Sequence, residues 1–341
     1  MKIKWLSVLQ YLLFLGLGLF LVWWSLQQIP SDKWEEFKNS LKTANYLLMI
    51  PVFFILSGSH VIRSIRWKIL MKPMGYEPSL PNVFFAVMIG YLANLAVPRL
   101  GEVLKCTILA RYEKIPADKL IGTILVERAF DVIFLGIVFL VAFILQYDII
   151  GEFAVEESKQ LFLGKSGQFS FSKLAIVLLV VVLSLLVLKK LFQYFNHLSI
   201  VVAIKKIING IWEGLSSIKN LQQKKSFIVY SISIWILYIA GTWVGLLATS
   251  GTAHLGLPTA ISALAFASIG MIITPGGIGA YAFFLAKVLE KNGVSFEIGF
   301  ANGTLQWFAQ FLIVLIIGFL CLALLPWYNK KEQNEISRCN K

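Results

Sequence analysis

The chain has 341 residues, of which 58% are hydrophobic and 14% charged, and its mean hydropathy is +0.77. This composition is typical of an integral membrane protein and excludes a soluble globular fold. The formal net charge is +13, which we attribute to membrane orientation and to anionic lipid. We therefore expect no nucleic-acid partner.

Cysteine and histidine are too few and too scattered for a disulfide framework or a metal site. Cys106, Cys321 and Cys339 are an odd number without the spacing of metal ligands. The histidines stand singly, without a pair of the HExxH type, and the chain has no GxxxxGK[ST] loop for ATP hydrolysis. We therefore expect no metal and no cofactor.

Long apolar blocks predict an all-α, polytopic bundle, because backbone groups in lipid must find their hydrogen bonds within a helix. About six blocks are long enough for full spans: residues 5–26, 46–62, 120–146, 174–188, 226–248 and 303–327. Basic residues in the connections mark the cytoplasmic side, and they place both termini there. After residue 62 these markers are Arg63, Arg66, Lys68 and Lys72.

Two further apolar blocks are broken at a proline and glycine. Residues 81–110 have basic connections at both ends, which predicts a re-entrant hairpin that turns at residues 98–101. Residues 257–289 are broken at TPGGIG (274–279) and would enter from the opposite side. Two broken segments of opposite direction are typical of an inverted repeat. The alternative is that both turns only connect packed helices.

The two breaks also predict a site for negative charge. Each proline can begin a returning half-helix whose N-terminus points N–H groups into the protein. Arg99 adds a guanidinium that can bind phosphate through two hydrogen bonds, and Lys105 adds a second cation. The glycine backbone of residues 276–279 would complete the cradle. The ligand that we expect here is anionic.

Charged residues also stand inside the span that begins near Leu120, in the sequence ERAFD (127–131). At about 1.5 Å per residue from Lys119, Glu127 would lie roughly 12 Å and Asp131 roughly 18 Å deep in a core of ~30 Å. The two carboxylates share a helix face, and Arg128 can pair with Asp131. Two interpretations stay open, a structural ion cluster between helices and a role in substrate or proton transfer.

We expect a single integral membrane domain over residues 1–341. Residues 199–222 carry isoleucines at helical spacing and lysines on the other faces. This pattern predicts an interfacial amphipathic helix on the cytoplasmic leaflet. Residues 328–341 are expected to form a cytoplasmic tail.

Three motifs together resemble the flippase-like membrane domain of lysylphosphatidylglycerol synthases, which also occurs in standalone bacterial and archaeal proteins. They are NLAVPRLGEVLK (94–105), VERAFD (126–131) and TPGGIGAY (274–281). The resemblance covers approximately residues 5–327 and implies a bundle with re-entrant helices that moves lipids or lipid-linked headgroups between leaflets. With Lys105, the residues that match the motifs are our candidates for substrate binding: Arg99, Gly101, Glu102, Glu127, Arg128, Asp131, Pro275, Gly276, Gly277 and Gly279.

The chain departs from the family pattern at two positions. Many relatives have a glycine between the proline and the arginine of the first motif, whereas Pro98 and Arg99 are adjacent here. Many relatives also have an acidic residue near the position of Tyr281, which puts a mechanism that uses this acid in doubt for this chain. The soluble aminoacyltransferase domain of the full synthases does not follow, so we expect no synthesis of aminoacyl lipid.

The leading hypothesis is a lipid translocator, not an enzyme, that binds an anionic, phosphate-bearing headgroup at a midplane site between the two re-entrant helices. Its expected partner is a membrane phospholipid or a lipid-linked anionic substrate, and the pattern leaves room for a homo-oligomer or an envelope-pathway partner. The alternatives are an accessory or structural subunit of an envelope lipid or glycan pathway, and an intramembrane lipid-modifying enzyme. An ion channel is disfavoured because no ring of like charges or filter motif is present. We expect the bacterial inner membrane.

Overall fold

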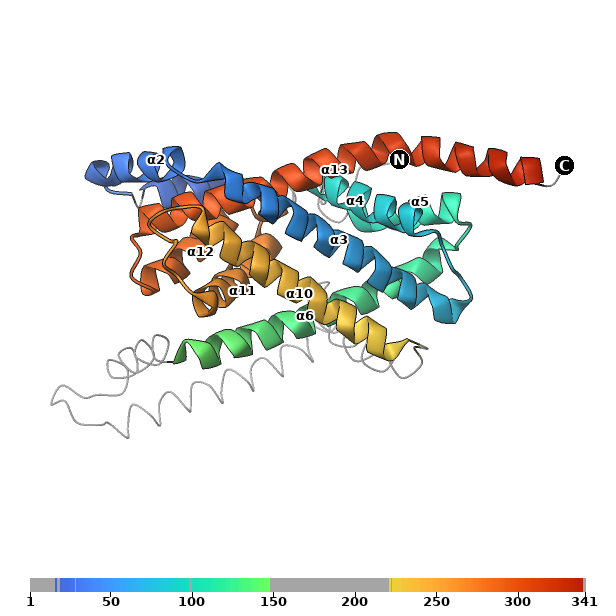
Figure 1. The fold of residues 1–341 in the computed structure, drawn as a ribbon, viewed down its shortest axis with the longest axis horizontal. Helices are drawn as coiled ribbons and strands as arrows, with labels where there is room; N and C mark the ends of the chain where they lie inside the picture. Colours follow the sequence, from blue (N-terminus) through green and yellow to red (C-terminus); the bar gives the residue numbers. More distant parts are fainter. Residues whose placement is uncertain are drawn as a thin grey trace, which may run out of the picture.

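The computed structural model describes residues 16, 19–27, 29–97, 100–147, 221 and 223–339 of the chain. Every regular element within these ranges is a helix (Figure 1). The helices form an elongated bundle in which the longest of them, α13 (Phe296–Cys339), runs along one side (Figure 1). The predicted all-α class is confirmed for the described part of the chain.

Within the described ranges, four helices are long and apolar enough to cross a membrane. They are α3 (Met49–Met71), α6 (Ala117–Leu145), α10 (Lys224–Leu247) and α13. Four of the predicted spans are thereby confirmed. Residues 174–188, most of residues 5–26 and nearly all of the predicted amphipathic segment 199–222 lie outside the described residues. Helix α13 continues through Pro326 and into the segment that we expected to be a tail.

Two pairs of shorter helices form hairpins at the two broken apolar blocks. The first hairpin is α4 (Leu80–Ala96) with α5 (Leu100–Tyr112), and the second is α11 (Leu257–Ile273) with α12 (Ala280–Lys291). Helices α4 and α11 both have 17 residues and both begin with Leu-Pro, where proline is tolerated because its missing N–H is not needed. At 1.5 Å per residue each is about 26 Å long, shorter than a ~30 Å hydrocarbon core.

Small residues allow the two helices of each hairpin to pack closely near the turn. A Cβ atom added to Gly101 would overlap the carbonyl oxygen of Gly90, and one added to Gly270 would lie 2.7 Å from the carbonyl oxygen of Ala280. Backbone contact of this kind is typical of helix pairs in membranes, where small residues let the backbones approach. The hairpins are therefore packed units.

Three helices in the first half of the chain each pack against a helix in the second half. Helix α3 packs along α10, α4 packs against α13, and α11 packs against α6. Helix α4 also contacts the 3-10 turn Pro275–Gly277, which lies between α11 and α12. The two hairpins lie at opposite ends of the bundle (Figure 1), and this contact shows that they approach each other at their turns.

A polar cluster ties the base of the first hairpin to α13. The amide of Asn82, the third residue of α4, donates to Glu113 Oε1 at 2.7 Å and to Asn329 Oδ1 at 2.9 Å. The amide of Asn329 donates back to Asn82 Oδ1 at 2.8 Å. Glu113 directly follows α5. We call Asn82, Glu113 and Asn329 the first clamp.

A matching cluster ties the base of the second hairpin to the end of α6. The amide of Gln146 donates to Asn292 Oδ1 at 2.7 Å and to Thr259 Oγ1 at 3.2 Å, and the Thr259 hydroxyl donates to Asn292 Oδ1 at 3.0 Å. Thr259 is the third residue of α11, and Asn292 directly follows α12. We call Thr259, Asn292 and Gln146 the second clamp. Thr259 and Asn292 hold the same places in the second hairpin as Asn82 and Glu113 in the first, and Gln146 takes the part of Asn329.

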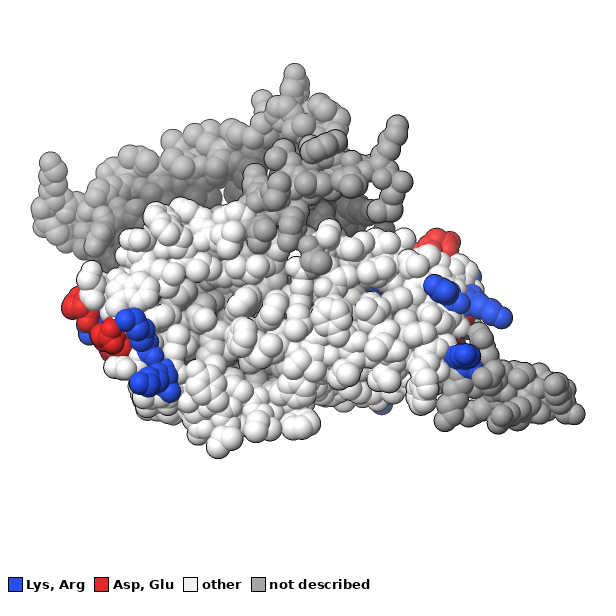
Figure 2. All heavy atoms as spheres, turned by 90° about the horizontal axis from the view of Figure 1, so that it is seen from above, with Lys and Arg blue, Asp and Glu red and all other residues white. Residues whose placement is uncertain are grey.

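Charged side chains gather at the two ends of the bundle, and a broad band without charge lies between them on the face that Figure 2 shows. Large apolar side chains are exposed along the helices that form the bundle, including Phe54, Leu140, Ile236 and Phe319. An exposed apolar surface of this extent is stable only against lipid or another protein. The chain is therefore a multi-pass membrane protein whose long helices cross the bilayer.

Candidate functional site

Two arginines of α3 face two carboxylates of α6 in the interior. Arg63 Nη1 donates to Glu127 Oε1 at 2.8 Å and to Asp131 Oδ2 at 2.7 Å. Arg66 Nη2 donates to Asp131 Oδ1 at 2.7 Å, and Arg66 and Glu127 are both 0% exposed. The predicted shared face of Glu127 and Asp131 is confirmed, because one guanidinium bonds both carboxylates.

Helix α10 adds two hydroxyl groups behind the arginines. Arg63 Nη2 donates to Tyr238 Oη at 3.2 Å, and Arg66 Nη1 donates to Ser231 Oγ at 3.2 Å. Hydrogen bonds of this kind reduce the cost of burying a guanidinium, which would otherwise lose its water without replacement. Helices α3, α6 and α10 are thus joined through one polar centre.

The first hairpin contributes a lysine to this centre. Lys105 of α5 is 1% exposed, and its Nζ lies 3.9 Å from Glu127 Oε2. The ammonium also lies 5.3 Å from the ring centre of Trp67 and 5.1 Å from that of Tyr91, within the range of cation–π attraction. It makes no hydrogen bond with the described residues. Lys105 is therefore held by electrostatic attraction alone.

A half-exposed ion pair connects the centre to the turn of the first hairpin. Arg128 Nε lies 3.4 Å from Glu102 Oε1, and Arg128 Nη1 lies 3.8 Å from Asp131 Oδ2. Glu102 is in the first turn of α5, and the side chain of Arg128 is 41% exposed. We define the ion cluster as the four cations and three carboxylates joined in this way: Arg63, Arg66, Lys105, Arg128, Glu102, Glu127 and Asp131.

The ion cluster has one more cation than carboxylates, and its buried part has unused donors. Arg63 Nε, Arg66 Nε and Lys105 Nζ are buried and have no hydrogen-bond partner in the part of the chain that the structure describes. A buried charge without full compensation is costly in a membrane protein, and such charges are kept where they face a partner, a cavity or a substrate. The excess of positive charge suits an anion at the half-exposed end of the cluster.

The expectation that Arg63 and Arg66 lie in a cytoplasmic connection is wrong. Helix α3 continues to Met71, and both arginines are buried inside it. The physical reason is that the carboxylates of α6 compensate their charge at that depth. Their spacing of three residues on a helix, matched to Glu127 and Asp131 four residues apart, is the signal that could have indicated this pairing.

The second hairpin turns through three glycines with backbone angles that other residues rarely adopt. Gly276, Gly277 and Gly279 have φ values of 61°, 76° and 71°, so their conformational freedom is required. The indole of Trp307 on α13 donates to the carbonyl oxygen of Gly276 at 2.7 Å and anchors the turn. The sequence analysis missed this role of Trp307.

The two turns approach each other in the interior. A Cβ atom on Gly276 would lie 3.4 Å from Leu95 Cδ2, near the end of α4. Pro98 and Arg99, which follow, lie outside the described residues. The structure therefore brings the second motif beside Gly101, Glu102 and Lys105 of the first, and it brings the turn of the third motif to the end of α4.

Some of the N–H groups at the two turns are already used within the protein. The N–H of Gly101 donates to Asn94 Oδ1 at 2.8 Å, and the N–H of Ala280 donates to the carbonyl oxygen of Ile278 at 2.8 Å. Tyr281 is 2% exposed, and its hydroxyl donates to Gln306 Oε1 at 3.5 Å. Side-chain cations, more than helix N-termini, make this region positive.

Metal-ligating side chains do not gather anywhere in the described ranges, where no group of three or more His, Cys, Asp or Glu could hold a metal ion. His60 lies against Tyr91 with ring centres 5.2 Å apart.

Most of the chain is similar to known membrane proteins. The profile of the family "Lysylphosphatidylglycerol synthase TM region" matches residues 8–331. A UPF0104 membrane protein of Methanocaldococcus jannaschii is 25% identical in an alignment 293 residues long, which covers 82% of this chain and 84% of the relative. A UPF0104 membrane protein of Methanothermobacter thermautotrophicus is 21% identical in an alignment 336 residues long, which covers 88% of this chain and 91% of the relative. No solved structure matches. The chain therefore belongs to the family of the lysylphosphatidylglycerol synthase transmembrane region, whose profile spans residues 8–331.

Proposed function

We propose that the protein moves a lipid between the leaflets of the membrane and does so without enzymatic chemistry. An anionic, phosphate-bearing headgroup binds at the half-exposed end of the ion cluster, between the two hairpin turns, while the lipid chains stay in the bilayer. The observation that carries the proposal is the buried excess of positive charge that reaches the turn of the first hairpin through Arg128 and Glu102.

Arg128 is the residue best placed to bind a phosphate. Its side chain is 41% exposed, and the separation of 3.4 Å between Arg128 Nε and Glu102 Oε1 leaves that pair weaker than the 2.7 Å contacts inside the cluster. A phosphate can replace Glu102 and make two parallel N–H···O hydrogen bonds, a geometry that suits guanidinium groups. The positive charge of Lys105 lies behind this position. Arg99 is expected to add a further guanidinium, and Gly276, Gly277 and Gly279 to line the opposite side.

We further propose that the two hairpins are re-entrant and form an inverted repeat. The packing of α4 on α13 corresponds to the packing of α11 on α6, and the two clamps occupy equivalent positions in the two halves. The hairpin helices are shorter than a full span and begin at opposite ends of the bundle (Figure 1). In transporters this arrangement places the binding site near the midplane, where broken helices meet.

Charge at the two ends supports cytoplasmic termini. The end that carries the base of the first hairpin and the start of α10 is mainly basic, with Lys72, Arg111, Lys119, Lys224 and Lys225. The other end mixes signs, as in the pairs Lys38–Glu35 and Lys287–Glu290. The positive-inside rule places the basic end in the cytoplasm. We therefore propose a cytoplasmic membrane with the end of α13 inside.

Translocation by the purified protein tests the proposal. Proteoliposomes carry phosphatidylglycerol with a fluorescent headgroup, and a membrane-impermeant quencher reports how fast the label changes leaflet. Arg128→Gln should slow the movement by about 10- to 100-fold, because a hydrogen bond to a charged group contributes about 1.5–3 kcal/mol. Arg111→Gln, which removes an arginine outside the ion cluster, is the matched control. An inactive wild-type protein in these vesicles would favour the accessory-subunit alternative instead.

A further inference from the structure

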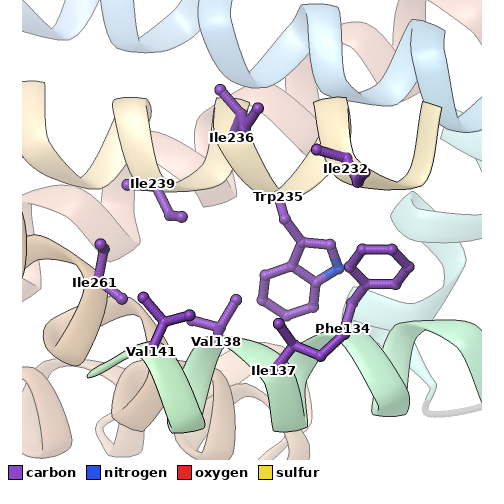
Figure 3. Close-up of a pocket in the computed structure, with 9 residues that line it drawn as sticks. All are labelled: Phe134, Ile137, Val138, Val141, Ile232, Trp235, Ile236, Ile239 and Ile261. Atoms are coloured by element: carbon purple, nitrogen blue, oxygen red, sulfur yellow. The ribbon is translucent and has the colours of Figure 1, made fainter. Parts of the chain in front are cut away.

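A groove without any polar lining lies between α6 and α10, next to the ion cluster (Figure 3). Its volume is about 200 Å³. The floor is formed by the buried side chains of Val138, Trp235 and Ile261, and the rim by exposed ones. The residues that line it are Phe134, Ile137, Val138, Val141, Ile232, Trp235, Ile236, Ile239 and Ile261.

The size and chemistry of the groove restrict its occupant to hydrocarbon. Drug-sized ligands fill pockets of about 300–1,000 Å³ that include some polar groups. This groove is smaller and wholly apolar, and it lies along the middle of two membrane-spanning helices. A part of a single extended chain fits this description, whereas a headgroup would lose its water there without replacement.

The groove continues from the polar centre on both helices. On α6, Phe134 stands three residues after Asp131 and shares its helix face. On α10, Trp235 stands between Ser231, which accepts from Arg66, and Tyr238, which accepts from Arg63. A charged site and an apolar groove that adjoin in this way match an amphiphile, with its headgroup at one end and its chain at the other.

The indole of Trp235 closes the floor of the groove next to the polar centre. Trp235 is 8% exposed, and its ring extends from α10 toward α6 beside Phe134 (Figure 3). Its Nε1 atom is buried and does not open into the groove. The groove therefore offers only apolar contacts to a chain that enters it.

We propose that the α6–α10 groove seats one acyl chain of the lipid whose headgroup binds at the ion cluster. This assignment rests on the proposed function for the identity of the headgroup site. It adds the place of the chain, which the charged residues alone do not specify.

Photo-crosslinking of the full-length protein tests the assignment. The probe is phosphatidylglycerol with a diazirine in one acyl chain, present as a trace in vesicles of phosphatidylglycerol and phosphatidylethanolamine, and the adducts are mapped by mass spectrometry. We expect adducts to concentrate on residues of the groove over Leu140, which is exposed on α6 outside it. Equal labelling of the groove and Leu140 would show ordinary surrounding lipid. An absence of lipid adducts in the groove would show that another part of the protein fills it. Either result overturns the proposal.

Two substitutions make the test specific. Val141→Phe places a ring in the groove, and adducts there should fall about tenfold, the change expected when roughly two methylenes lose their burial. Val132→Phe, at an exposed position of α6 outside the groove, is the matched control and should leave the adducts unchanged. Equal adducts from wild type and Val141→Phe refute the seat.

A neutral probe separates this proposal from the proposed function. Diacylglycerol with the same diazirine chain has no phosphate. If it labels the groove as strongly as phosphatidylglycerol does, the chain seat is supported although the headgroup site fails. If only phosphatidylglycerol labels the groove, both proposals are supported. If neither probe concentrates there, the seat is refuted, and the translocation of headgroup-labelled lipid by wild type and Arg128→Gln still tests the headgroup site.

Discussion

Asp131 is the carboxylate on which the ion cluster depends most, since it accepts from Arg63 and Arg66 at 2.7 Å each and lies 3.8 Å from Arg128. Asp131→Asn keeps the shape of the side chain and removes its charge. Arg66 is fully buried, and the carboxylate left beside it would then be that of Glu127, whose Oε1 lies 3.5 Å from Arg66 Nη2. Removal of one partner of a buried ion pair costs about 3–5 kcal/mol, because the other charge stays buried without compensation.

The free energy of unfolding of the purified protein in mixed micelles, measured by titration with a denaturing detergent, checks this value. Lys38→Ala is the control, because the pair of Lys38 and Glu35 is exposed (side chains 60% and 75%) and pairs of this kind contribute about 0–1 kcal/mol. The double variant Arg66→Met with Asp131→Leu removes both charges and should recover much of the loss. If Asp131→Asn unfolds like the control, the ion cluster does not hold α3 to α6, and the electrostatic argument for the site is wrong.

Three further predictions concern the hairpins and the helix α2 (Trp34–Lys42). Gly277→Ala should destabilise the protein by at least about 1–2 kcal/mol in the same titration, because φ is 76° and the new Cβ would overlap Met271 Sδ; stability equal to wild type would contradict the turn. Gln146→Ala should increase amide hydrogen exchange at the ends of α11 and α12 but not of α4 and α5, and an equal increase in both hairpins would argue against separate clamps. Lys33 donates to Glu36 at 2.9 Å and holds the pKa of that carboxyl below its ordinary value of 4.5. This contact therefore stabilises α2 above that pH and is lost as the pH falls through the lowered pKa. Amide hydrogen exchange in α2 should rise on acidification in wild type, and it should rise less in Glu36→Gln.

The helices and their breaks follow closely from the sequence because lipid permits few backbone conformations. The segment predicted at 257–273 coincides with α11, and the break at TPGGIG is a turn that requires glycine. Glu127 and Asp131 were placed on one face by helical periodicity alone, and the structure confirms it. Local rules of this kind depend only on neighbouring residues.

The partners of these residues could not be predicted in the same way. Arg63 and Arg66 pair with residues more than sixty positions away, and by local charge alone they resemble a cytoplasmic connection. Glu113 and Asn292 look like ordinary polar residues at helix ends, and only the packing of the helices shows that they close the two clamps. The groove between α6 and α10 is equally invisible to periodicity, because an apolar residue that faces lipid and one that lines a groove look the same in sequence.

The central claim is that an anionic headgroup binds at the end of the ion cluster, between the two hairpin turns. An experimental map of the protein in nanodiscs of phosphatidylglycerol tests it most directly. The account predicts a phosphate about 2.7–2.9 Å from the guanidinium of Arg128, with Glu102 displaced. A map in which Arg128 and Glu102 stay paired, with every bound phosphate at the membrane surface, would contradict it.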